Sequence, residues 1–347
     1  MPDARDPIAD LRRIAYLLER AHEKTYRVRA FRGAAGKLAK LPEGELAARA
    51  RAGTLTEVPG IGDVTARCVA ESLNGEEPVY LRRLEATAGQ DLDEETAALL
   101  RSLRGDCHSH SDWSDGGSPI DEMAMAAAQL GHEYLVLTDH SPRLTVARGL
   151  SAERLAEQLD VVAEVNAGFA GLGMSFRLLS GIEVDILADG SLDQTDELLA
   201  RLDVVVASVH SNLKDEPEVM TRRMVTALAN PHMDILGHCT GRLITGGRGT
   251  RAESRFDAAA VFAAAVEHDK AIEINSRPER LDPPKRLLRV ALETGCRFSI
   301  DTDAHAPGQL DWLANGCARA VACGVPADRI VNTLPADELL AWTAAHQ

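Results

Sequence analysis

The sequence lacks three features that would place the chain in a membrane or outside the cell. No apolar run approaches the roughly 20 residues that a membrane-spanning helix needs. The N-terminal stretch MPDARDPIADLRR lacks the apolar core of a signal peptide. The six cysteines are scattered and form neither a CxxC pair nor a dense disulfide framework. We therefore expect a reduced, cytoplasmic protein that has no membrane partner.

Length and charge indicate two domains of different character. The 347 residues are too many for one ordinary domain, and the 45% apolar content is sufficient for a sizeable core. The net charge of −15 is uneven, because residues 1–90 carry +2 and residues 91–347 carry −17. An acidic part that concentrates cations can coexist with a part that contacts phosphate. Net charge therefore does not exclude a nucleic-acid partner.

Residues 1–90 are expected to form a small all-α domain. Apolar residues recur at helical spacing from Leu11 to Leu18, and the pattern continues to Leu41 before a break at Pro42–Gly44. Residues 55–69 then place two short apolar segments around a tight Gly-x-Gly turn. Residues 91–103, DLDEETAALLRSL, are interpreted as a linker whose polar start leads into one more helix.

The pattern changes in residues 104–347, where short apolar strands alternate with alanine-rich helical stretches. The strands end in polar clusters such as LVLTDH, GIEVDI, VVVASVH and SIDTDAH. Seven such repeats favour a parallel α/β barrel over a six-stranded open sheet. Active sites of these barrels lie at the carboxyl ends of the strands.

Metal-ligand residue types follow these predicted strand ends. His108 and His110 are two residues apart, so both imidazoles are expected on one face, and Asp303 and His305 repeat that spacing. Imidazole mixed with carboxylate suits Zn²⁺, Mn²⁺ or Fe²⁺ better than Ca²⁺ or Mg²⁺. The predicted multinuclear site comprises nine residues: His108, His110, Asp115, His140, Glu183, His210, His238, Asp303 and His305.

The order His-x-His, Asp, Asp-His, Glu, His, His, Asp-x-His resembles the PHP (polymerase and histidinol phosphatase) family of metal-dependent phosphoesterases. The resemblance covers residues 104–347 and implies a distorted (β/α)7 barrel with three divalent ions. It implies a first ion held by His108, His110, Glu183 and Asp303. Glu183 would bridge to a second ion held by His210 and His238, and Asp115, His140 and His305 would hold a third. Glu183, Asp303 and His140 are the implied catalytic residues.

Longer strings, including TDHSPRLTVARGLS and EINSRPERLD, resemble the C-terminal PHP domain of bacterial family X DNA polymerases. Residues 1–88 are similar to the N-terminal domain of DNA polymerase beta, including a helix-hairpin-helix at VPGIGDVTA. In such a hairpin Gly60, Ile61 and Gly62 would bring backbone amides to a DNA phosphate. The alternative is a plain helical hairpin.

Two departures from that resemblance limit the expected activities. The polymerase palm and fingers are missing, and Asp91-Leu-Asp93 fits a helix cap better than a catalytic carboxylate pair, so polymerase activity is rejected. Cys68 occupies the position of the lysine that forms a Schiff base in the polymerase beta domain, which puts lyase activity in doubt.

The expected activity is DNA 3′-end processing in repair, as a 3′→5′ exonuclease, a 3′-phosphatase or both, on duplex or gapped DNA. Arg242, Arg277 and Arg280 follow strand ends and could bind the substrate phosphate, or form ordinary surface salt bridges. A small-molecule phosphomonoesterase acting on histidinol phosphate is the first alternative. A DNA-binding accessory protein with a purely structural barrel is the second.

Overall fold

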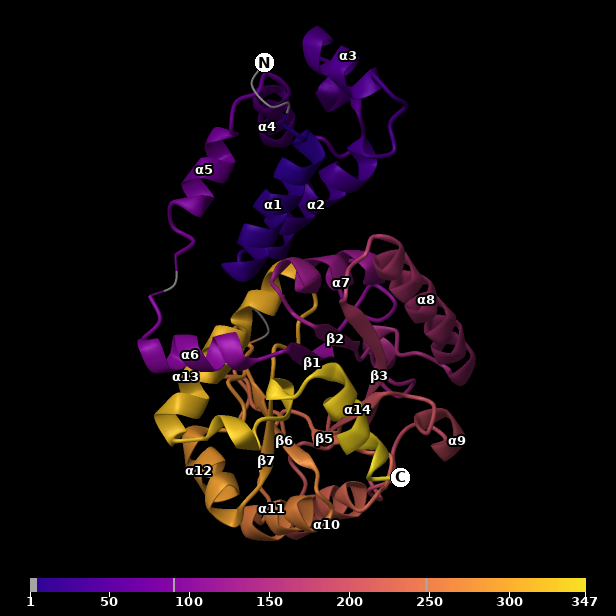
Figure 1. Ribbon diagram of the computed structural model, residues 1–347, viewed down its shortest axis with the longest axis vertical. Coiled ribbons are helices and arrows are strands. Elements are labelled where there is room, and N and C mark those ends of the chain that lie inside the picture. The colour runs from indigo at the N-terminus through magenta and orange to yellow at the C-terminus, as the bar shows by residue number, and fades with distance from the viewer. Residues whose placement is uncertain (1–4, 90, 247–248) are drawn as a thin grey trace. The chain divides into compact units, whose positions relative to one another are not determined.

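The computed structural model describes residues 5–89, 91–246 and 249–347, and Figure 1 shows their arrangement. The chain divides into two compact units, Met1–Asp91 and Leu92–Gln347. Within the described ranges, none of the helices combines the length and apolar character that a membrane crossing requires.

The first unit is all helical. Its first helix begins where Asp6 accepts a hydrogen bond from the backbone N–H of Ile8 and Pro7 takes the first helical position. Leu11, Ile14 and Leu18 of this helix are fully buried in a core shared by the other helices. The helices of the unit are α1 (Pro7–Arg20), α2 (Thr25–Leu38), α3 (Glu45–Ala52), α4 (Asp63–Leu73) and α5 (Val79–Glu85).

The predicted Gly-x-Gly turn lies between the short helix η1 (Leu55–Glu57) and α4. Gly60 has a φ of +88°, a conformation that favours glycine. Ile61 is buried in the helical core, and Gly62 caps α4 while its N–H donates to Thr65 Oγ1 at 3.0 Å. The turn therefore fixes the angle at which the chain enters α4.

The second unit is a barrel of seven parallel strands in sequential order, as predicted. Each strand is followed by helical or looped segments that cover the outside of the sheet (Figure 1). The strands are β1 (Gly105–Ser109), β2 (Tyr134–Leu137), β3 (Arg177–Asp185), β4 (Val204–Ser208), β5 (Ile235–Leu236), β6 (Ala271–Asn275) and β7 (Arg297–Asp301). The main helices are α6 (Glu94–Ser102), α7 (Ile120–Gln129), α8 (Ala152–Gly171), α9 (Asp196–Leu199), α10 (Pro217–Leu228), α11 (Ala258–Glu267), α12 (Lys285–Thr294), α13 (Leu313–Cys323) and α14 (Ala336–Ala344).

The barrel closes irregularly between β1 and β7, where hydrogen bonds of one asparagine side chain take the place of regular strand pairing. Asn332 donates from Nδ2 to the Gly105 carbonyl at 3.3 Å and to Asp301 Oδ1 at 2.9 Å. Its Oδ1 accepts from the Ile300 N–H at 2.6 Å. One side chain thus satisfies backbone groups of both edge strands, which would otherwise be buried without partners. The expected distorted (β/α)7 architecture is confirmed.

The segment expected to be a linker is mostly the first helix of the second unit. Asp93 caps α6 by accepting from the Thr96 N–H at 2.8 Å, so the predicted helix-capping role of this acidic stretch is confirmed. Leu99 of α6 is buried in the main core of the barrel unit, and α6 packs on α13. The contact boundary lies between Asp91 and Leu92.

Candidate metal centre

The carboxyl ends of the barrel strands bring the predicted ligand residues together. His108 lies in β1 and Glu183 in β3, whereas the other residues lie in the loops that follow the strands. The sequence predicted that Asp303 continues the last strand, but Asp303 comes after β7 and has a φ of +54°. The backbone turn, and not strand alternation, therefore directs this carboxylate.

Glu183 lies at the centre of five imidazoles and is 1% exposed. Each of the five presents a ring nitrogen to one of its two carboxylate oxygens. The distances from Oε2 are 3.4 Å to His108 Nε2, 3.6 Å to His110 Nε2 and 2.8 Å to His140 Nδ1. Those from Oε1 are 3.2 Å to His210 Nε2 and 2.8 Å to His238 Nε2.

The electrostatics of this cluster keep Glu183 ionised. Burial opposes ionisation, but the charges of His210, His108 and His140 hold the pKa of the Glu183 carboxyl well below its ordinary value. Burial likewise opposes protonation of His140, yet the charge of Glu183 raises the pKa of its imidazole to about 10. In the metal-free protein, protons on His108, His140 and His210, whose pKa values are raised, therefore balance the buried carboxylate.

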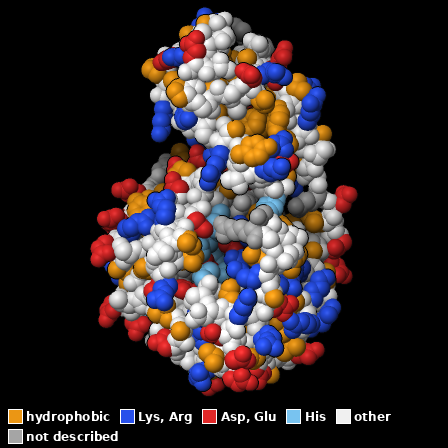
Figure 2. All heavy atoms as spheres, turned by 180° about the vertical axis from the view of Figure 1, so that it is seen from behind, with side chains coloured by type: hydrophobic (Ala, Val, Ile, Leu, Met, Phe, Trp, Pro, Cys, Tyr) orange, Lys and Arg blue, Asp and Glu red, His pale blue; other side chains and the backbone are white. Residues whose placement is uncertain are grey.

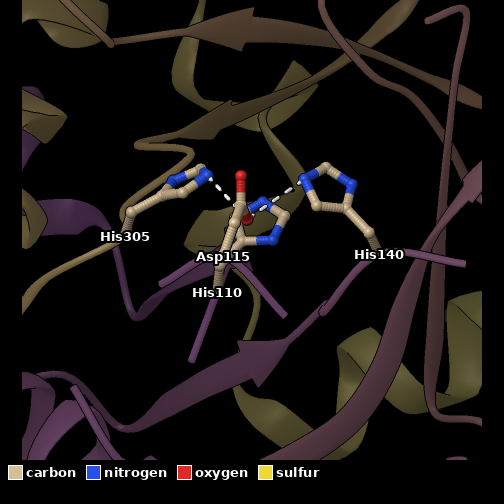
Figure 3. Close-up of side chains that lie close together, drawn as sticks. All are labelled: His110, Asp115, His140 and His305. Atoms are coloured by element: carbon tan, nitrogen blue, oxygen red, sulfur yellow. Dashed lines mark ion pairs between the residues drawn. The ribbon is translucent and has the colours of Figure 1, made fainter. Parts of the chain in front are cut away.

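A second group gathers around Asp115, as Figure 3 shows. Asp115 Oδ1 lies 3.2 Å from His305 Nε2 and 3.4 Å from His140 Nε2. His110 joins these three residues, with one potential ligand atom from each lying within 4.8 Å of the others. Burial and the nearby charges of His305 and His140 lower the pKa of His110 to about 3, so its imidazole is neutral at physiological pH. Neutral imidazole is the form that binds metals.

Asp303 connects the cluster to two arginines. Its Oδ1 lies 3.4 Å from His110 Nε2, and its Oδ2 accepts from Arg280 Nε at 3.0 Å. Burial raises the pKa of this carboxyl, but the charge of Arg277 and the nearby imidazole of His110 hold it well below its ordinary value. Asp303 is therefore a buried carboxylate at the edge of the histidine cluster.

The groupings differ from the ligand sets that the family resemblance implied. His110 lies with Asp115, His140 and His305 as well as with His108 and Glu183, and a third group contains His140, Glu183 and His210. His140 links two groups because its Nδ1 faces Glu183 and its Nε2 faces Asp115. All nine predicted residues lie in one connected cluster, but these distances do not separate them into three exclusive sets.

The donor set fits divalent cations. Both oxygens of Glu183 and ring nitrogens of His108, His110, His210 and His238 are buried without a hydrogen-bond partner among the described residues. Such atoms are costly to bury unless something satisfies them. A mixture of imidazole nitrogens and carboxylate oxygens suits Zn²⁺, Mn²⁺ or Fe²⁺.

Supporting carboxylates hold the imidazoles in place, and one of them was missed in the sequence. Glu273 of β6 accepts from His108 Nδ1 at 2.6 Å through Oε1 and from the His238 N–H at 2.5 Å through Oε2. Asp185 lies 3.3 Å from His210 Nδ1. The sequence did contain a signal for Glu273. The strand with the pattern Glu-x-Asn contributed no predicted metal ligand, unlike the other strands, so its glutamate was available for a supporting role.

The three predicted phosphate-binding arginines occupy different environments. Arg242 donates to the carbonyl oxygens of Arg280 and Leu281 and pairs with Glu253, so it supports the backbone beside the site. Arg277 Nη1 donates to the Asp303 carbonyl at 2.9 Å and lies 2.9 Å from His305 Nδ1. Arg280 Nη1 is buried without a hydrogen-bond partner among the described residues.

In the first unit, a lysine lies against the glycine turn. Lys37 Nζ donates to the Pro59 carbonyl at 2.7 Å, and a Cβ built on Gly60 would lie 2.2 Å from this nitrogen. Gly60 thus leaves room for an ammonium group at the turn. Arg32, which lies in α2 with Lys37, instead pairs with Glu19 at 2.6 Å. Cys68 is buried, and burial raises the pKa of its thiol to about 11.

The barrel surface is hollowed over the cluster. Figure 2 shows histidine side chains within this hollow, with lysine and arginine side chains beside it. His305 and Asp115 keep side-chain exposures of 17% and 28%, whereas His108 and Glu183 are fully covered. The Asp115 side of the cluster is therefore the part that is open to solvent.

Comparisons with known proteins identify both units. Residues 106–277 match the PHP domain, and residues 3–77 match a helix-hairpin-helix domain. The DNA polymerase/3′-5′ exonuclease PolX of Bacillus subtilis is 43% identical over 221 residues, which is 64% of this chain. The match spans only 37% of that relative's length.

Other relatives are phosphatases by name. A probable phosphatase of Thermoanaerobacter is 27% identical over 243 residues, covering 66% of this chain and 89% of that protein. The solved histidinol phosphate phosphatase of Lactococcus lactis, complexed with zinc, L-histidinol and phosphate, has a TM-score of 0.44 and 19% identity. The structural match covers 63% of this chain and 92% of the Lactococcus lactis chain.

Proposed function

Since this chain belongs to the PHP family of metal-dependent phosphoesterases and carries a helix-hairpin-helix domain, we propose that it hydrolyses phosphoesters at DNA 3′ ends. The observation that carries the proposal is the ionised, buried Glu183 among five imidazoles in a chain that also holds a DNA-type hairpin. The 43% identity with an exonuclease-named relative supports DNA as the substrate. Its role would be end trimming in repair.

The metal ligands of the proposal are the nine clustered residues. Divalent cations, proposed to number three, would supply Lewis acidity and lower the pKa of coordinated water. Glu183 would share its two oxygens between cations, because separate imidazoles face each oxygen. Proton release from His140 would accompany loading, since its pKa of about 10 keeps it charged without metal.

The arginines are proposed to have different roles. Arg280 would bind a phosphate oxygen of the substrate through its unpartnered Nη1, because its Nε is already held by Asp303. Arg277 would position Asp303 and His305, which it already contacts. Arg242 would support the backbone that carries Arg280. Of the three arginines, only Arg280 is proposed to contact the phosphate.

The hairpin would contribute affinity for the DNA backbone. Gly60, Ile61 and Gly62 present a turn and the N-terminus of an 11-residue helix, and Lys37 adds an ammonium group beside them. The side chain of Asp63 in the first turn of α4 opposes an anion there. Lys37 is therefore the expected phosphate contact of this turn.

A small-molecule phosphomonoesterase is the second candidate. It is favoured by the probable phosphatase that this chain matches over 89% of that protein's length. The two candidates share the metal cluster and differ in whether the helical unit takes part. Ionic strength separates them, because binding through several DNA phosphates weakens steeply with salt, whereas binding of a small monoester responds much less.

The experiment uses a 5′-labelled primer annealed to a template, ending in a 3′-hydroxyl or a 3′-phosphate, with Mn²⁺. Wild-type protein is expected to give a shortening ladder, loss of the phosphate, or both. Asp303→Asn, which keeps the side-chain volume, should abolish the product. Asp328→Asn changes an exposed aspartate outside the cluster and should process the primer normally.

Two results would contradict the proposal. An intact primer in every lane, with histidinol phosphate hydrolysed by the same preparation, would favour the small-molecule reading. Metal binding without turnover of either ester would favour a DNA-binding accessory protein. Circular dichroism of each variant separates lost chemistry from lost folding.

A further inference from the structure

The loop between Ser141 and Gly149, called here the 141–149 loop, begins directly after the clustered residue His140. Its two ends are joined, because the Leu150 N–H donates to the His140 carbonyl at 2.7 Å. A Cβ on Gly149 would lie 1.8 Å from the Ser141 carbonyl oxygen, so only a glycine fits where the two ends of the loop meet. A compact loop with adjacent ends is an Ω-loop, a type that is frequently functional.

Contacts on both sides make the loop rigid. On one side, Asp193 Oδ2 accepts from Ser141 Oγ at 2.9 Å and from the Arg143 N–H at 2.6 Å. On the other side, Arg154 Nη1 donates to the Arg148 carbonyl at 2.7 Å. Arg148 itself has a φ of +58°, an uncommon conformation for a side chain of this size. The surrounding structure therefore fixes the position of the tip.

The tip presents an apolar side chain between two cations. Val146 is 91% exposed, more than any other large hydrophobic side chain of the described residues. Arg143 and Arg148 are both exposed on either side of it. Arg148 Nη1 also donates to the carbonyl of Asp112, in the segment that leads to Asp115, at 3.3 Å. In a nucleic-acid strand, the apolar faces of sugars and bases alternate with charged phosphates. A valine between two arginines matches this alternation.

We propose that the 141–149 loop binds the DNA strand next to the 3′ end that enters the metal centre. Val146 packs on a sugar or base face, and Arg143 and Arg148 contact the flanking phosphates. Val146 lies six positions after His140 in the chain, so the tip lies within about 20 Å of it. That distance spans roughly six nucleotides of a stacked strand. The inference rests on the proposed function, because it names the part of the barrel that selects DNA.

The decisive experiment is a photo-cross-link that requires no turnover. All six native cysteines are buried, so the exposed thiol of Val146→Cys can be labelled selectively with an azidophenacyl reagent. In the full-length protein, the label is expected to cross-link to a primer–template within about six nucleotides of the primer 3′ end. Val266→Cys, at a 43% exposed valine on α11, is the matched control and should give at least tenfold less product.

A kinetic comparison keeps the proposal separate from the proposed function. Val146→Asp should lower the ratio of kcat/KM for the primer to kcat/KM for bis(p-nitrophenyl) phosphate at least tenfold. Absence of the cross-link, or an unchanged ratio, would overturn the role of the loop even when the wild type trims DNA. Failure of the wild type to process DNA would overturn the proposed function, whereas the cross-link alone would still report whether the loop contacts the strand.

Discussion

Replacing Glu273 with glutamine tests how the barrel orients the imidazole of His108. Both Glu273 oxygens accept hydrogen bonds, one from His108 Nδ1 and the other from the His238 N–H and Asn275 Nδ2. Glutamine keeps the volume but offers only one acceptor oxygen, so its amide N–H groups must face a donor. Either His108 loses its orienting partner or the His238 backbone is left without an acceptor.

The expected effect is large because Glu273 and His108 are both fully buried. Removing a carboxylate that orients a metal-binding histidine typically costs 10- to 100-fold in metal affinity or activity. This corresponds to about 1.4–2.7 kcal/mol of binding free energy. Loss of the Glu273 charge also removes one of the interactions that raise the pKa of His108 against its burial.

The assay is calorimetric titration of the metal-free protein with Mn²⁺ or Zn²⁺, together with the metal dependence of ester hydrolysis. Glu267→Gln, an exposed glutamate at the end of α11, is the matched control and should bind metal as the wild type does. A folded Glu273→Gln protein with an affinity within twofold of wild type would refute the orienting role.

Three further predictions follow from the metal cluster, the hairpin and the buried thiol. Mn²⁺ at 100 times its Kd should stabilise the barrel by about 2.7 kcal/mol, or roughly 5–10 °C in Tm, and an unchanged Tm by calorimetry would contradict native-state binding. Gly60→Ala should weaken DNA binding several-fold by anisotropy, because the φ of +88° strains an alanine there and its Cβ would displace Lys37 Nζ, whereas Gly36→Ala, with open space around it and no positive φ, should not. Equal affinities of these two variants would contradict a role for the turn. Cys68 should resist iodoacetamide at pH 8 and react only as the pH approaches its pKa of about 11, since the thiolate is the nucleophile and forms as pH rises. Rapid labelling of the native protein at pH 8, measured by mass spectrometry, would contradict its burial.

The strand pattern predicted the barrel and the position of its site because both depend on local signals. Short apolar runs that end in polar residues marked the strands, and parallel strands bring their carboxyl ends to one rim. Of the eight predicted ligand residues other than Glu183, seven needed only this rule to be placed near it. The prediction failed locally at Asp303, whose left-handed backbone is invisible to strand periodicity.

Contacts between distant segments could not be read from the sequence. Asn332 closes the barrel by bonding to Gly105 and Asp301, more than 30 residues away from either. Arg242 follows a strand end like the other arginines, but it bonds to backbone carbonyls of the segment carrying Arg280. Such pairings depend on the three-dimensional packing of loops, which no spacing rule encodes.

The most direct test of the central claim compares two substrates in one preparation loaded with Mn²⁺. Turnover of a 3′-phosphorylated primer–template and of histidinol phosphate is measured at 50 and 200 mM salt. We expect efficient primer processing that falls steeply with salt, because cationic side chains that bind DNA phosphates release the counterions held there. An untouched primer beside salt-insensitive hydrolysis of histidinol phosphate would contradict it.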